Sequence, residues 1–223
     1  MAINTPYKGP HDLPQIIPVF PLEGALLLPR GDLPLNIFEP RYLRMVDDAI
    51  RGDRIIGMIQ PTDGNEEGPD KTPGLLACGC AGRISAFGES GDGRYLLTLT
   101  GVARFRVLEE LSTTTPYRQC RVDYSEFAID FLPGEGEDEV DRAGVLKTLR
   151  DFADSHGLSV DWRGIDAAPN DALVNALAMM SPFGAREKQA LLEAVDLKTR
   201  AEVLIAIAEF SLARREGDSV GLQ

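Results

Sequence analysis

The cysteine residues are the first candidates for chemistry in this sequence. Cys78 and Cys80 form a C-x-C pair, whereas redox helices and zinc ribbons use the C-x-x-C spacing. Residues two positions apart lie on the same face of a β-strand, so this spacing predicts two strand residues in or near a core. A reactive thiol at either position is the alternative, because an activated thiolate is a nucleophile. With Cys120, the three cysteines are too few for a disulfide framework.

Other catalytic and metal-binding patterns are not found in the sequence. Asp154, Ser155 and His156 are adjacent, whereas a catalytic triad is assembled from distant segments. Neither His11 nor His156 has another histidine or a cysteine at metal-ligand spacing. No G-x-x-x-x-G-K-[ST] sequence occurs, and none of the five lysines stands in a context that activates a nucleophile. We therefore predict no catalytic residue, no metal and no cofactor.

Five residues could instead bind a partner: Phe38, Glu39, Arg41, Tyr42 and Trp162. Glu39 and Arg41 stand at a strand-to-helix junction, where they could pair and pin the corner or grip a peptide. Phe38 and Tyr42 are expected in the core, with a peptide groove as the alternative. Trp162 is expected to dock a loop between helices, with partner anchoring as its alternative.

The net charge disfavours several classes of partner. The chain carries −12 at neutral pH, about −4 in residues 1–127 and −8 in residues 128–223. Nucleic-acid binding needs a basic face for the phosphates, and anionic membranes also attract cationic segments. No apolar run approaches the roughly 20 residues of a membrane span, and residues 1–14 lack the pattern of a secretory signal. The sequence favours a cytoplasmic protein that binds neither nucleic acid nor membranes, and it leaves the oligomeric state open.

Short strand patterns separated by proline and glycine occupy the first half of the chain. The expected strands cover residues 16–20, 25–28, 33–38, 54–59, 76–87, 95–100, 102–108 and 117–123. Four prolines among them cannot donate to a strand ladder, which favours a bent barrel over a flat sheet (Pro18, Pro21, Pro29 and Pro34).

Two further segments of the first half have distinct patterns. One helix is expected at Pro40–Ile50, with Gly52 after it. A solvated loop is expected over residues 61–73.

In the strand expected at 102–108, Phe105 is expected on an apolar face and Arg104 on a polar one.

The second half of the chain has helical periodicity. Apolar residues recur at helical spacing before Gly157, after Asn170, over about 185–195 and from 197 to about 214. The predicted class is α+β. Its parts are a flexible leader (1–13), a β subdomain with one inserted helix (14–127), a linker (128–137), a bundle of about four helices (138–215) and a flexible tail (216–223).

A series of motifs resembles the N-terminal, substrate-binding domain of bacterial Lon proteases. The most specific is Phe38-Glu39-Pro40-Arg41-Tyr42, which follows the proline-broken stretch Ile17 to Leu22. Similar motifs follow at Gly79–Ile84, Gly93–Phe105, Glu187–Glu193 and Asp196–Arg200, so that the resemblance covers about residues 14–213.

The resemblance implies a PUA-like, mostly antiparallel β-barrel followed by a helical bundle. It also implies recognition of protein or peptide segments, including unfolded ones; cereblon carries a related domain. The ATPase and serine–lysine peptidase of a full Lon protease have no counterpart here, so a stand-alone, non-catalytic module is expected. Two alternatives remain. One is an enzyme using Cys78 or Cys80, and the other is a PUA-like RNA-binding protein, which the net charge of −12 disfavours.

Overall fold

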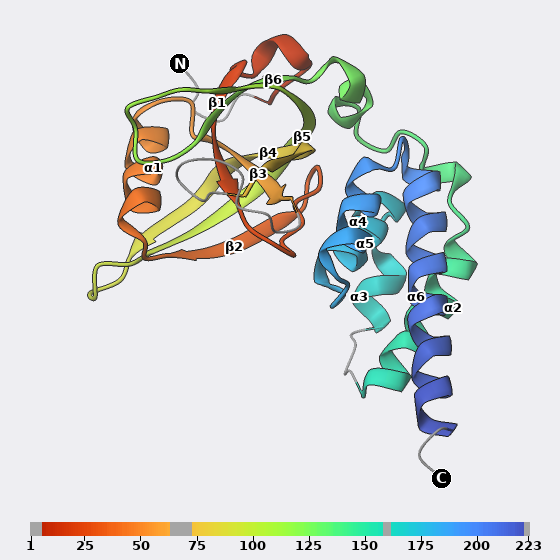
Figure 1. The fold of residues 1–223 in the computed structure, drawn as a ribbon. Helices are drawn as coiled ribbons and strands as arrows, with labels where there is room; N and C mark the ends of the chain where they lie inside the picture. The colour runs from red at the N-terminus through yellow and green to blue at the C-terminus, as the bar shows by residue number, and fades with distance from the viewer. Residues whose placement is uncertain (1–5, 63–72, 158–161, 221–223) are drawn as a thin grey trace.

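The computed structural model describes residues 6–62, 73–157 and 162–220. Within these ranges the chain has a mixed α+β fold, with one six-stranded sheet and most of its helices gathered on one side (Figure 1). The strands are β1 (Ile16–Pro21), β2 (Asp32–Ile37), β3 (Ile55–Pro61), β4 (Leu75–Glu89), β5 (Tyr95–Leu111) and β6 (Gln119–Asp123). The predicted α+β class is confirmed.

The strand pairings form a closed circuit with one strand outside it. The order is β2-β5-β4-β3-β1-β6, and β5 also pairs with β6. All pairs are antiparallel except β1 with β3. Strand β2 pairs only with the first part of β5 within the described residues. It is therefore an edge strand, as its central Pro34 requires.

Two of the strand predictions were wrong. Residues 25–28 form a loop whose leucines are buried against the sheet. The carbonyl oxygen of Leu28 lies over Gly101, where a β-carbon would approach it to 2.0 Å. Only glycine allows the two backbone segments to approach so closely. The apolar run at 25–28 therefore packs into the core as a loop and does not pair as a strand. The two strands expected on either side of Gly101 are a single strand, β5.

Helix α1 (Pro40–Arg51) covers one end of the sheet, in agreement with the predicted helix (Figure 1). Its buried stripe is Tyr42, Met45, Val46 and Ala49. Its outer carboxylates are tied to the sheet. The hydroxyl of Tyr95 donates to Asp47 Oδ1 at 3.0 Å, and the hydroxyl of Tyr117 donates to Asp48 Oδ2 at 3.0 Å.

The remaining helices lie mostly in the second half of the chain. They are the 3-10 helices η1 (Pro10–Asp12), η2 (Ser125–Phe131) and η3 (Glu137–Glu139), and the α-helices α2 (Arg142–His156), α3 (Trp162–Ala167), α4 (Asn170–Met180), α5 (Ala185–Glu193) and α6 (Leu197–Val220). Helix α6 packs against α2, α4 and α5 (Figure 1). An apolar helix therefore holds the others together, because its buried side chains face several neighbours.

Three segments differ from their predictions. Helix α3 replaces the loop expected at Trp162. In the expected leader, η1 forms and Leu13 is buried with β1 residues. Helix α6 continues into the expected tail. The loop predicted over 61–73 lies largely outside the described residues.

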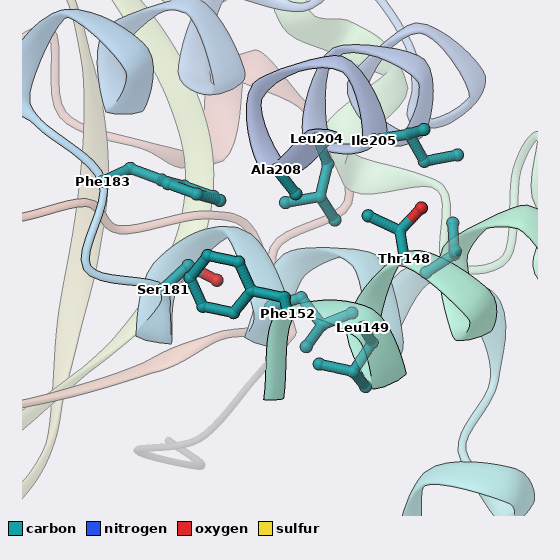
Figure 2. A pocket seen from close by; sticks show the side chains of 10 residues that line it. Thr148, Leu149, Phe152, Ser181, Phe183, Leu204, Ile205 and Ala208 are labelled. Atoms are coloured by element: carbon teal, nitrogen blue, oxygen red, sulfur yellow. The ribbon is translucent and has the colours of Figure 1, made fainter. Parts of the chain in front are cut away.

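A small cavity lies among α2, α4 and α6 (Figure 2). Its volume is about 20 Å³, which is room for about one water molecule. The lining is apolar apart from the hydroxyls of Thr148 and Ser181, and Phe152 and Phe183 meet edge to face at 5.8 Å beside it. A space of this size is a packing defect and not a ligand site.

Buried charges join the sheet to the helices. Arg104 of β5 donates to both carboxylate oxygens of Asp130, at 2.9 and 2.8 Å, and to the carbonyl oxygens of Leu192 (3.1 Å) and Ala194. Its side chain is 1% exposed and that of Asp130 is 5% exposed. Arg104 does lie on the opposite face of the strand from Phe105, as predicted. The helices cover that face, so Arg104 is buried and not on a polar surface. Asp130, in the predicted linker, is buried with it.

Candidate peptide-binding surface

The predicted aromatic pair divides between core and surface. Tyr42 is buried, with its ring 4.3 Å from that of Phe20. Phe38 directly follows β2 and is 62% exposed. The guanidinium of Arg94, from the turn between β4 and β5, lies 5.8 Å from the Phe38 ring. Phe38 is therefore available to a partner, whereas Tyr42 is not.

Glu39 and Arg41 form an ion pair at the strand-to-helix corner. The Arg41 Nε atom donates to Glu39 Oε2 at 3.0 Å, and the Arg41 guanidinium lies 4.6 Å from the Tyr42 ring. Both charged side chains are more than 40% exposed. Such an exposed pair contributes at most about 1 kcal/mol. It fixes the corner and leaves its charges accessible to solvent.

Trp162 lies in a different part of the molecule. It begins helix α3, where it is half-buried, and the Arg150 guanidinium of α2 lies 5.2 Å from its ring. The α1 corner belongs to the sheet, while α3 belongs to the group of helices (Figure 1). The five residues singled out by the sequence do not form one site.

Some of the exposed apolar side chains of the sheet lie near its edge strand. A groove of about 420 Å³ runs over β2, β5 and β4. Leu96 (52% exposed) and Phe87 (43% exposed) line it. Leu96 is opposite Asn36 on one side and Gly88 on the other, so no side chain covers its second flank. We call Pro34, Asn36, Phe38, Phe87 and Leu96 the β2 surface.

The free edge of β2 carries unpaired backbone groups. The N–H of Gly101 donates to the carbonyl of Gly31 at 2.8 Å, so the backbone of Gly31 points toward β5. Because backbone direction alternates along a strand, Asp32, Pro34 and Asn36 direct their backbone groups toward the free edge. Pro34 then loses no ladder bond. The N–H of Asn36 is left as a donor in the middle of this edge.

A second groove begins where β2 begins. It lies between residues 29–32 and helix α4, has a volume of about 470 Å³, and is walled by Met179 and Met180. Met180 is 83% exposed. Methionine side chains adapt to irregular partners. We call this the α4 groove; it extends the β2 surface onto the helices.

Arg30 forms the rim of the α4 groove in a strained conformation. Its φ of 65° is unusual for a residue with a side chain. The strain is held by its contacts: Arg30 Nε donates to Asp171 Oδ2 at 2.9 Å and Nη1 donates to the carbonyl of Asp130 at 2.9 Å. Strain of this kind often accompanies functional sites.

Several of these residues were not predicted from the sequence. The exposure of Leu96 could have been predicted. Leu97 and Leu99 share one face of the strand and Leu96 lies on the opposite face, so if the first two are buried, Leu96 points outward. The exposure of Met180 could not have been predicted, because the sequence at the end of a helix does not show which of its faces a neighbouring element covers. The conformation of Arg30 could not have been predicted either, because arginine rarely adopts a positive φ.

The thiols of the described structure are buried. Cys78 and Cys120 are 0% exposed and Cys80 is 1% exposed. Burial raises the pKa of Cys78 to about 12, that of Cys120 to about 11 and that of Cys80 well above its ordinary value. These groups are protonated at neutral pH and inaccessible, which contradicts the alternative of a reactive thiol at Cys78 or Cys80. The prediction of strand residues in the core is confirmed.

The described residues contain neither a membrane-spanning helix nor a cluster of metal ligands. None of the helices there is both long and apolar enough to cross a bilayer. In the same residues, no three histidine, cysteine or acidic side chains come together as a metal would require.

Comparison with known proteins identifies relatives over most of the chain. The family model of the ATP-dependent protease La (LON) substrate-binding domain matches residues 16–209. Lon protease 2 of Myxococcus xanthus is 30% identical over 207 residues, which is 88% of this chain and 24% of that protein. The Lon protease of Anaeromyxobacter dehalogenans is 26% identical over 206 residues, 88% of this chain and 23% of that protein. The chain thus spans about a quarter of the length of these relatives.

Solved structures give the same result. A crystal structure of a Lon N-terminal domain protein from Xanthomonas campestris aligns with a TM-score of 0.61 and 26% identity, over 86% of this chain and 97% of that one. The N-terminal domain of the Lon protease from the Mycobacterium avium complex aligns with a TM-score of 0.63 at 18% identity, over 87% and 98%. The second likeness concerns the fold alone.

Proposed function

Since the chain belongs to the family of Lon substrate-binding domains, we propose that it is a non-catalytic module that recognises exposed, extended segments of other proteins. The cytoplasm is the compartment in which we expect it to act. The net charge of −12 supports protein rather than RNA as the partner. The ATPase and peptidase activities of the relatives are not proposed for this chain.

We place the recognition site on the β2 surface and the adjoining α4 groove. The single observation that carries this assignment is an edge strand with a free backbone donor and exposed apolar side chains beside it. An extended segment can add to such an edge through backbone hydrogen bonds, while pockets select its side chains. The six residues of β2 provide room for a short strand.

The anchors of this site follow from their exposure. Leu96 and Phe38 present apolar area beside β2, Phe87 lines the groove from β4, and Met180 presents apolar area at the α4 groove. The groove around Leu96 is open because Gly88 has no side chain. An apolar side chain of the bound segment would cover Leu96, and the apolar surface of both side chains would be removed from water. This hydrophobic burial is the main driving force for binding at this site.

Binding of an unfolded protein tests the proposal. The probe is a fluorescein-labelled protein, reduced and carboxymethylated so that it cannot refold, and its anisotropy is followed as the chain is added. Replacing a buried leucine contact by a carboxylate removes about 1.5–3 kcal/mol, so L96D should weaken binding at least about tenfold.

The matched control is L108D. Leu108 lies on the same strand, is 62% exposed and is outside both grooves. Its replacement should change the dissociation constant by less than about twofold. Equal effects of the two variants would move the site away from β2, and absence of binding by the unaltered chain would refute the recognition function itself.

A further inference from the structure

Four of the five methionines lie in the described residues, and they divide by exposure. Met45 and Met58 are 0% and 3% exposed in the core. Met179 and Met180 end helix α4, where Met179 is half-buried and Met180 is 83% exposed. Both line the α4 groove. Within the part of the chain that the structure describes, the methionines that an oxidant in solution can reach are therefore gathered at one site.

The Met179 thioether touches the backbone at the point where the α4 groove meets β2. Met179 Sδ occupies the space that a β-carbon on Gly31 would fill, and Met179 Cε would lie 3.1 Å from such an atom. Gly31 is held on both sides, since its N–H donates to the carbonyl of Leu28 at 3.0 Å and its carbonyl accepts from the N–H of Gly101 at 2.8 Å. An oxygen atom added to Met179 Sδ would crowd this backbone and would find the Gly31 N–H already used.

We propose that Met180 and Met179 are an oxidation site, where peroxide switches off binding at the α4 groove. The inference rests on the proposed function, because it concerns the same surface. Each thioether takes one oxygen atom and becomes a sulfoxide. The sulfur lone pair attacks one peroxide oxygen, and the S–O bond forms as the O–O bond breaks. The departing hydroxide takes the proton of the transferred hydroxyl and leaves as water, so that sulfur is oxidised by two electrons and peroxide is reduced by two.

The two sulfoxides act on binding in different ways. Met180 is the more exposed, so it should react first. Its sulfoxide presents a polar oxygen where the thioether presented an adaptable apolar surface. Met179 should react more slowly, and its sulfoxide should move the side chain off Gly31 and change the shape of the groove. The loss of apolar contact should weaken binding of an unfolded segment at least about fivefold.

Oxidation of the full chain with hydrogen peroxide, followed by removal of the peroxide with catalase, tests the proposal. Mass spectrometry of peptides counts the oxygen atoms gained at Met179 and Met180. The anisotropy of the labelled, carboxymethylated probe then gives the dissociation constant, which should rise at least about fivefold. Treatment with methionine sulfoxide reductases should remove the oxygen and restore the original value, since together these enzymes reduce both epimers of the sulfoxide.

The matched control is M179L/M180L. Leucine has a similar volume and no sulfur, so this variant should bind the probe within about threefold of the unaltered chain, and peroxide should not change its affinity. It keeps the three cysteines and the other methionines, so an effect of peroxide on any of those would appear in it too. Circular dichroism before and after oxidation establishes that the helices are kept.

The outcomes separate this inference from the proposed function. An equal loss of affinity in M179L/M180L would overturn the inference, and so would oxidation of Met45 and Met58 before Met179 and Met180. A chain that binds the probe equally before and after it gains oxygen would overturn the inference alone. A chain that binds no probe even before oxidation would refute the recognition function on which the inference rests.

Discussion

At the scale of single residues, burial gives the cysteines a role in stability. Burial raises the pKa of Cys78 to about 12 and that of Cys120 to about 11, above the ordinary value near 9. The folded state therefore binds the thiol protons more tightly than the unfolded state does. Stability from this source is complete below the ordinary pKa and is lost as the pH rises from about 9 toward 11.

A pH series of urea unfolding experiments should show this loss. We expect the free energy of unfolding to fall between pH 9 and 11, by up to about 1.4 kcal/mol per pH unit for each thiol. C78A should fall less steeply over the same range, since it lacks one of the titrating groups. The same slope in C78A and the unaltered chain would assign the loss to other groups, such as the buried tyrosines.

The sequence predicted the burial of Tyr42 better than the exposure of Phe38. Tyr42 shares a helical face with Met45, Val46 and Ala49, so the period of the helix identifies it as core. Phe38 precedes the helix, and its direction depends on how β2 ends beside the turn that carries Arg94. That contact joins residues 56 positions apart, which no local pattern encodes.

At the scale of elements, the edge of β2 decides whether strand addition is possible. Its unpaired backbone groups lie at Asp32, Pro34 and Asn36, because Gly31 and every second residue after it point toward β5. Pro34 already lacks one donor. The N–H of Asn36 is then the donor on which an added strand depends in the middle of the edge.

N36P should weaken binding of the unfolded probe about fivefold, the value of one backbone hydrogen bond. The ladder with β5 does not use this N–H, so thermal unfolding should shift by only a few degrees. N36A also removes the asparagine side chain but keeps the backbone N–H, so it should bind like the unaltered chain. Equal losses in N36P and N36A would point to the side chain and would argue against strand addition.

The order of the elements was predicted more reliably than their boundaries. Proline and glycine spacing identified the strands because those residues limit backbone pairing. It failed at residues 25–28, where an apolar run packs against Gly101 without pairing. It also failed at Trp162, where a short helix, α3, forms within a connection too brief for a periodic pattern. The closed circuit of strands rests on β1 pairing with both β3 and β6, and β6 lies about 100 residues away in the sequence, so only the tertiary structure reveals it.

At the scale of the whole molecule, the sheet and the helices share one apolar core and are also joined by buried polar groups. Besides Arg104 and Asp130, Gln60 of β3 donates to the carbonyl of Ala185 at 2.9 Å, and Gln189 of α5 donates to the carbonyl of Cys78 at 3.3 Å. Directional bonds of this kind fix one orientation of the two parts. The proposed binding surface crosses this junction, from β2 to α4, so its shape depends on that orientation.

Removal of one partner from the buried ion pair measures how much the junction contributes. D130A leaves the Arg104 guanidinium buried without its carboxylate, and we expect it to lose about 3–5 kcal/mol of unfolding free energy in urea. The comparison is D151A, which breaks the exposed pair of Lys147 and Asp151 at 3.1 Å and should lose less than about 1 kcal/mol.

A double variant separates the two causes of that loss. In R104M/D130L both charges are replaced by apolar side chains of similar volume, so neither member of this pair is left behind as a buried charge. Recovery of most of the stability would show that the loss in D130A comes from the stranded guanidinium. If the double variant stays as unstable as D130A, the bonds from Arg104 to Leu192 and Ala194 hold the helices to the sheet. In that case peptide binding at the α4 groove should be lost together with stability, because Arg30 on its rim donates to the backbone of the same Asp130 segment.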